Sequence, residues 1–238
     1  SYQVQKCRNN PVFFYNERGY YEKDKFWLAL IVGTVALIGS CAKKDDSSTA
    51  STTSSCATDT TASGSITVGS ETLSGTYVSD CNDLTGSSAI GQYLPSDVLA
   101  NRDVLVVTGS DNVSEESYFY TDTKCTNLSA YLKDGNDNFT VGDQSGDYYK
   151  VTYKEATFKV MAVTSTAVTF FETYFATYGI TNQGTAINLV VGTEYSMDGS
   201  GKNEMNIFHV SSTTVQHGDD DNQTQPTTMD SLVMTKEE

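Results

Sequence analysis

The sequence predicts an all-β fold, an antiparallel up-and-down β-barrel, over residues 66–238. Strand-forming residues are abundant, with 15 Tyr and 10 Phe, whereas only 3 Pro occur. Short apolar or alternating runs recur along this part of the chain, and Gly, Asn, Asp and Ser separate them. No long segment shows strong helical periodicity, and closing the sheet into a barrel would remove its exposed edges.

The predicted strands follow one another at hairpin spacing. In chain order they are GTYVSDC (75–81), DVLVVTG (103–109), ESYFYTDTK (116–124), DYYKVTYKEATFKVMAVTS (147–165), AVTFFETYFATYG (167–179), TAINLVVGTEYSM (185–197), EMNIFHVSS (204–212), TTVQHGD (213–219) and MDSLVMTK (229–236). The run 147–165 is interpreted as two adjacent strands around residues 154 and 155. For 167–179 a helix is the alternative, because Phe170, Tyr174 and Tyr178 are four residues apart.

Four polar segments between these runs are predicted to be turns, because they consist largely of Gly, Asn, Asp and Ser. They are KDGNDN (133–138), GDQSGD (142–147), MDGSGKNE (197–204) and HGDDDNQTQP (217–226). Some of their oxygens would suit calcium, but none of the segments has the spacing of an EF-hand loop.

The amino-terminal part contains a short apolar segment. KDK (23–25) precedes FWLALIVGTVALI (26–38), and Gly39, Ser40 and Cys41 follow. A membrane-spanning helix needs about 20 apolar residues, so this shorter run indicates the apolar region of a signal peptide. The part ahead of it is longer than a usual leader, which we interpret as an extended leader or an over-extended start.

The sequence IGSC resembles the lipobox of bacterial lipoproteins, with Ile38, Gly39 and Ser40 in the positions before Cys41. The resemblance implies diacylglycerol on the Cys41 thiol, cleavage before Cys41, and a further fatty-acid chain such as palmitate on the new amino group. It also implies an outer-membrane lipoprotein, because Ala42 rather than Asp follows the cysteine. Whether the protein faces the surface or the periplasm is left open.

The chain is therefore predicted to have three parts: a lipoprotein signal peptide (1–40), a lipidated cysteine with a flexible Ser/Thr-rich tether (41–65), and the barrel (66–238). Of five cysteines, cleavage removes Cys7 and lipidation occupies Cys41. Disulfides persist outside the cytoplasm, so we expect a bond between Cys81 and Cys125. Cys56 is then free, or it displaces one of these partners.

The barrel region resembles the lipocalin-like lipoproteins of diderm bacteria. The resemblance is carried by GTYVSDC (75–81), YFYTDTKC (118–125) and the closing segment from IFHVSS (207–212) to the end. It implies a barrel around an interior that is either filled or open to one ligand. The G-x-W signature of true lipocalins is absent, and Gly75 and Tyr77 occupy that arrangement.

No catalytic, nucleotide-binding or metal-binding pattern occurs in the sequence, so we predict a non-enzymatic protein without cofactor or metal. The net charge of -15 argues against nucleic acid as a partner. Aromatic side chains are the candidates for a ligand pocket: Tyr118, Tyr120, Tyr153, Phe158, Phe171 and Tyr174. The leading hypothesis is a lipid-anchored binding domain that engages a protein partner, such as a surface adhesin. The alternative is a carrier of a small hydrophobic ligand.

Overall fold

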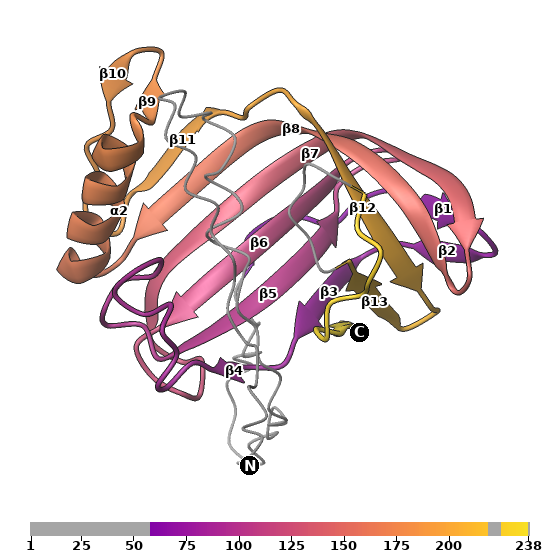
Figure 1. Cartoon of the computed structure of the whole chain (residues 1–238), viewed down its shortest axis with the longest axis horizontal. Helices are drawn as coiled ribbons and strands as arrows, with labels where there is room; N and C mark the ends of the chain where they lie inside the picture. Colours follow the sequence, from indigo (N-terminus) through magenta and orange to yellow (C-terminus); the bar gives the residue numbers. More distant parts are fainter. Residues whose placement is uncertain (1–57, 219–224, 238) are drawn as a thin grey trace, which may run out of the picture.

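A computed structural model of the chain describes residues 58–218 and 225–237 (Figure 1). The predicted signal peptide, the lipobox and Cys41, and also Cys56, lie outside the described residues, so they stay predictions. Within the described residues, no helix is both long enough and apolar enough to cross a membrane.

The fold is a closed eight-stranded antiparallel β-barrel in up-and-down order, which confirms the predicted fold class. Each strand pairs with the next barrel strand along the chain, and the last pairs with the first. The eight strands are β3 (Thr76–Ser79), β5 (Ala100–Val107), β6 (Val113–Tyr120), β7 (Leu128–Ser145), β8 (Tyr148–Ala162), β12 (Asn203–Val210), β13 (Thr214–His217) and β14 (Met234–Lys236).

The long hairpin of β7 and β8 corrects two expectations from the sequence. The run 147–165 forms one strand, β8, rather than two, and KDGNDN lies inside β7 rather than in a turn. The pairing of the two strands shifts register between Gly135 and Asn136 and again further along. These irregularities accommodate turn-type residues within a continuous strand. The first half of β8 pairs with β12, and the second half pairs with β11 (Glu194–Asp198).

The prediction of a strand over 167–179 is wrong, because this segment is the helix α2 (Ser165–Tyr178). Thr164 caps its start, where the Oγ1 atom accepts a hydrogen bond from the Ala167 amide at 3.1 Å. Gly179 ends it with φ 66°, in the left-handed region that favours glycine. The buried residues Ala167, Phe171, Tyr174 and Phe175 share one face of the helix. Packing of this face against the barrel outweighs the strand propensity of the segment.

Small elements complete the fold at the two ends of the barrel. A hairpin of β1 (Ile66–Val68) and β2 (Glu71–Leu73) lies at one end, and α2 lies at the other with the hairpin of β9 (Thr181–Asn182) and β10 (Thr185–Ala186) (Figure 1). The two-residue strand β4 (Asn82–Asp83) pairs with β5.

Among residues 58–218 and 225–237, buried apolar side chains form three separate clusters. The helix-end cluster consists of Leu84, Leu94, Val98, Phe119, Ala130, Leu132, Phe158, Val160, Ala162, Ala167, Phe171, Tyr174, Phe175, Ile187 and Leu189. The hairpin-end cluster consists of Ile66, Val68, Leu73, Tyr77, Leu105, Val107, Val113, Phe139, Val151, Tyr153, Phe208, Val210, Val215 and Met234. The outer cluster consists of Val104, Val106, Tyr118, Tyr120 and Tyr131. Its members alternate along the strands with residues of the first two clusters, so they lie on the outer face of the barrel wall.

Residues 58–65, which the sequence assigns to the tether, lie against this outer face. The Ser63 amide donates to the Val107 carbonyl at 2.8 Å, and Ala62 packs on the outer cluster. The buried Lys133 ammonium forms ion pairs with Asp59 and, at 3.7 Å, with Glu116. The packed part of the chain therefore includes residues ahead of the predicted boundary at 66.

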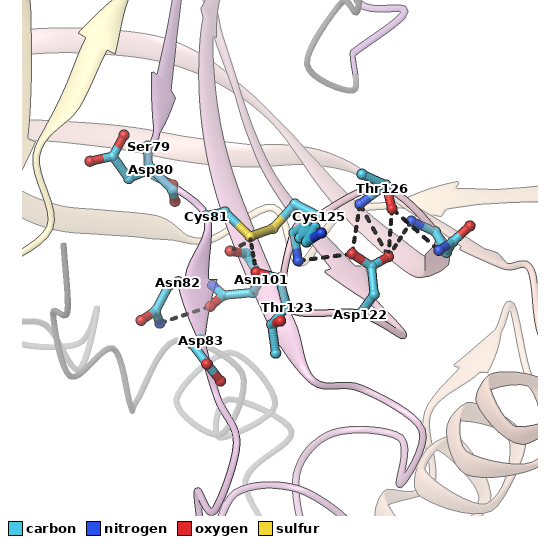
Figure 2. Close-up of a disulfide and its surroundings, with 12 residues drawn as sticks. Ser79, Asp80, Cys81, Asn82, Asp83, Asn101, Asp122, Thr123, Cys125 and Thr126 are labelled. Carbon is cyan, nitrogen blue, oxygen red and sulfur yellow. Dashed lines mark hydrogen bonds between the residues drawn. A yellow bond between two sulfur atoms is a disulfide. The ribbon is translucent and has the colours of Figure 1, made fainter. Parts of the chain in front are cut away.

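The predicted disulfide between Cys81 and Cys125 is present, with the two Cα atoms 5.9 Å apart (Figure 2). It joins the segment after β3 to the loop after β6. The Asp122 carboxylate organises that loop by accepting hydrogen bonds from the amides of Lys124 at 2.8 Å and Asn127 at 2.6 Å (Figure 2).

Candidate ligand-binding site

A polar layer crosses the inside of the barrel between the two apolar clusters. Along β5, Val107 and Leu105 belong to the hairpin-end cluster, and Asp103 and Asn101 follow on the same face. Along β6, Val113 belongs to the hairpin-end cluster and Phe119 to the helix-end cluster. Successive inward positions of a strand are two residues apart, so Glu115 and Ser117 fall between them.

Strands β7 and β8 show the same change from apolar to polar. In β7, Asp134 and Asn136 lie between Leu132 of the helix-end cluster and Phe139 of the hairpin-end cluster. In β8, Glu155 lies between Tyr153 and Phe158, and it pairs with Asn136. Glu204 of β12 pairs with Tyr153 and shares its face. The polar layer consists of Asn101, Asp103, Glu115, Ser117, Asp134, Asn136, Glu155 and Glu204.

One side of the polar layer is a hydrogen-bonded group around Asp103. Its carboxylate accepts hydrogen bonds from Ser117 Oγ at 2.6 Å and from Asn101 Nδ2 at 3.0 Å. Asn101 Oδ1 in turn accepts a bond from Asn82 Nδ2 at 2.9 Å. These bonds fix the orientation of the Asp103 carboxylate, which remains half-buried.

The other side is less completely bonded. Glu115 accepts a hydrogen bond from Asn136 Nδ2 at 3.2 Å, and Glu155 accepts one from the Ser200 amide at 3.0 Å. Two oxygens in this group, Asp134 Oδ1 and Asn136 Oδ1, are buried and have no hydrogen-bond partner. A buried polar atom without a partner costs about 1–3 kcal/mol, so these two atoms are exceptions that need an explanation.

Burial makes the ionised form of these carboxyls unfavourable. It raises the pKa of both Asp103 and Glu115, against the opposing effects of their hydrogen bonds and of His217. Burial also raises the pKa of Asp134 well above its usual range, and the negative charges of Glu155, Glu115 and Glu204 add to that effect. The site therefore gathers carboxyl groups whose ionised form is poorly solvated, so that burial favours their protonated form.

The side chains of the polar layer are also more accessible than those of the apolar clusters. Asp103, Glu115, Ser117 and Asp134 face the inside of a closed barrel but are only half-buried. The apolar side chains on either side, by contrast, are almost fully buried, as with Leu105. Protein interiors are normally close-packed, so partly accessible side chains inside the barrel distinguish the polar layer from the two apolar clusters.

The structure distributes the predicted pocket residues over all three clusters. Tyr118 and Tyr120 lie in the outer cluster, and Tyr153 lies in the hairpin-end cluster. Only Phe158, Phe171 and Tyr174 come together, in the helix-end cluster. The alternation of β6 separates Tyr118 and Tyr120 from Phe119, but alternation alone does not say which face of a strand points inward.

The carboxylates of the polar layer were not among the predicted site residues. Asp134 and Asn136 belong to KDGNDN, which was predicted to be a turn. The sequence places Asp103 two residues before Leu105, on the same face of the strand, but alternation does not show that this face points inward.

Among the described residues, no group of three or more His, Cys, Asp and Glu side chains is arranged to hold a metal ion. No protein-family model matches the chain, and no curated protein matches it in sequence. The fold and the polar layer therefore define the class of protein: a closed antiparallel β-barrel with a layer of acidic side chains across its interior.

Proposed function

We propose that this protein is a lipid-anchored, non-enzymatic binding protein of the outer membrane, and that its barrel holds a small ligand inside. The observation that supports an internal ligand is the half-buried polar layer, which lies between the apolar clusters at the two ends of the barrel. Barrels with eight strands are wide enough either to be filled by side chains or to hold one small ligand.

A bound ligand explains features of the polar layer that a filled interior does not. A packed core would place an apolar side chain at Asp134, because a buried carboxyl without full hydrogen bonding destabilises a fold. Residues kept at such a cost are typical of binding sites. Their position favours a polar ligand over the purely hydrophobic one that the aromatic content of the sequence suggests.

The anchor is the second part of the proposal, and it rests on the lipobox residues 38–41. One acyl chain binds a membrane only reversibly, whereas the acyl chains expected on Cys41 would hold the protein there stably. Replacing Cys41 with Ala should move the protein from the membrane fraction to the soluble fraction. Retention of this variant in the detergent phase, at the level of the parent protein, would contradict the anchor.

Native mass spectrometry of the protein extracted from its own membranes tests the ligand. We expect an additional non-covalent mass that Ser117→Leu removes, because Ser117 is a half-buried, inward-facing residue of the polar layer. Thr157→Leu is the matched control, since Thr157 is exposed on β8, and it should keep the mass. Absence of any bound mass from the parent protein in repeated preparations would count against an internal ligand.

Binding of a protein partner, as by a surface adhesin, is the second candidate function. The observation that favours it is an adjacent pair of exposed apolar residues between β10 and β11, Val190 and Val191, which are 65% and 53% exposed. Replacing both with Ser should weaken binding to a protein partner and leave an internal ligand in place. The two candidates are thus separable by one double variant.

A further inference from the structure

We infer that the ligand of the polar layer is an organic cation, an amine bound in its ammonium form. This inference rests on the proposed function, because it names the chemical class of the internal ligand. It is carried by the carboxyl groups of the layer, by the buried oxygen atoms left without a hydrogen-bond partner, and by the aromatic rings beside the layer.

The charge of the layer is strongly one-sided. Five carboxyls face the inside of the barrel at this level: Asp103, Glu115, Asp134, Glu155 and Glu204. Among the described side chains whose charge affects the pKa of Asp103 and Glu115, His217 is the basic one. The side chains whose charge affects the pKa of Asp134 are all carboxylates. The nearby Lys133 lies on the outer face, where it pairs with Asp59 and Glu116.

The two buried oxygen atoms of the layer that have no hydrogen-bond partner both require a hydrogen-bond donor. Asp134 Oδ1 and Asn136 Oδ1 are buried without a hydrogen-bond partner, and Asn136 is only 3% exposed. The Asn136 amide group already donates to Glu115, so its oxygen is left to accept. An ammonium group offers up to three N–H donors and no acceptor, which matches such a site. It also supplies the positive charge, whereas a neutral donor or a water molecule satisfies only the hydrogen bonds.

The arrangement of the acidic side chains does not match that of a metal site. No three acidic or histidine side chains of the described residues converge as metal ligands. An organic cation needs no such convergence, because it can contact separate carboxylates through separate N–H groups.

Aromatic rings adjoin the layer on its hairpin side. Phe139 stacks on Tyr153 with ring centroids 5.8 Å apart and meets Phe208 edge-on at 5.4 Å. The Tyr153 hydroxyl also hydrogen-bonds Glu115. Aromatic faces attract ammonium groups and accommodate apolar bodies, so an amine with an aromatic or apolar body fits both parts of the site.

Isothermal titration calorimetry on the full-length protein in detergent tests the inference with a matched pair of probes. Phenethylamine and 2-phenylethanol share the same phenylethyl group. The first carries an ammonium group at neutral pH, whereas the second carries a hydroxyl group. We expect phenethylamine to bind at least tenfold more tightly at neutral pH. Asp134→Asn and Glu115→Gln should each weaken the amine at least tenfold and leave the alcohol unchanged. Asp143→Asn, at an exposed position of β7, should change neither.

The outcomes separate the inference from the proposed function. If the two probes bind equally well and Ser117→Leu abolishes the binding of both, the inference of an amine ligand is contradicted, but the internal binding site is supported. Displacement of phenethylamine by equimolar Ca²⁺ would also overturn it, in favour of a metal. Binding of neither probe, together with no bound mass in the native protein, would overturn the proposed function itself.

Discussion

The disulfide between Cys81 and Cys125 should contribute about 4 kcal/mol to the free energy of unfolding. The two cysteines are 44 positions apart in the sequence, and the bond keeps this loop closed in the unfolded chain. On the chain-entropy account, a closed loop of this length restricts the unfolded chain by ~4 kcal/mol at 25 °C. In a domain of 150–250 residues, 1 kcal/mol shifts Tm by about 2–4 °C, so Tm should fall by about 8–16 °C without the bond.

The folded structure should change little when the bond is removed. Both cysteines are half-buried, so serine is tolerated in their place. The loop that carries Cys125 is also held independently by Asp122, which accepts hydrogen bonds from the amides of Lys124 and Asn127. These bonds lower the pKa of Asp122 despite the opposing effect of its burial. The expected loss of stability therefore comes mainly from a less restricted unfolded state.

Urea unfolding, followed by circular dichroism, measures this loss. The variant Cys81→Ser/Cys125→Ser should be compared with the protein that retains both cysteines, each in a Cys56→Ser background so that no third thiol exchanges. Unchanged near-ultraviolet spectra would show that the native packing is retained. A loss below about 1 kcal/mol would refute the entropic reasoning for this bond.

Three further predictions concern other parts of the fold. The raised pKa of Asp134 means that its contribution to stability is fully present below its unfolded pKa and is lost as pH rises through the folded pKa. The ligand-free protein should therefore lose stability as pH rises from the unfolded pKa of aspartate, about 4, to the raised pKa of the folded state, by up to about 1.4 kcal/mol per pH unit for this group, and Asp134→Asn should flatten the urea-unfolding profile. Lys133→Ala should cost about 3–5 kcal/mol, since it leaves Glu116 buried without its ion pair, and limited proteolysis should then cut within residues 58–65. Gly179→Ala should cost about 1 kcal/mol at φ 66°, measured as a fall in Tm; an unchanged Tm would contradict the cap.

The barrel was predictable because alternation with a period of two is strong in its strands and because turns separate them. The first predicted strand, at 75–81, and the last, at 229–236, contain β3 and β14, which pair to close the sheet. The helix was missed because its aromatic and β-branched residues favour a strand. Its two end signals, Thr164 and Gly179, were present in the sequence, but an isolated Thr or Gly is common in a chain of this composition.

The polar layer was not predictable for a different reason. A strand pattern separates two faces, and only the closed structure shows that the face carrying Asp103 points inward while that of Tyr118 points outward. The shifts of register in β7 also place Asp134 and Asn136 in a strand, against the preference of their neighbours for turns. The disulfide, by contrast, followed from compartment and from the elimination of the other cysteines.

Closure by β14 has a consequence for how the protein is made. Ser79 of β3 pairs with Met234 of β14, which lies 155 positions later in the chain. A ribosome adds about 5–20 residues per second, so β14 is synthesised roughly 8–30 s after β3. During that interval the acidic interior lies open to water, where its carboxylates are fully hydrated. The polar layer becomes enclosed only when the last strand pairs with the first, so closure of the barrel is a late step of folding.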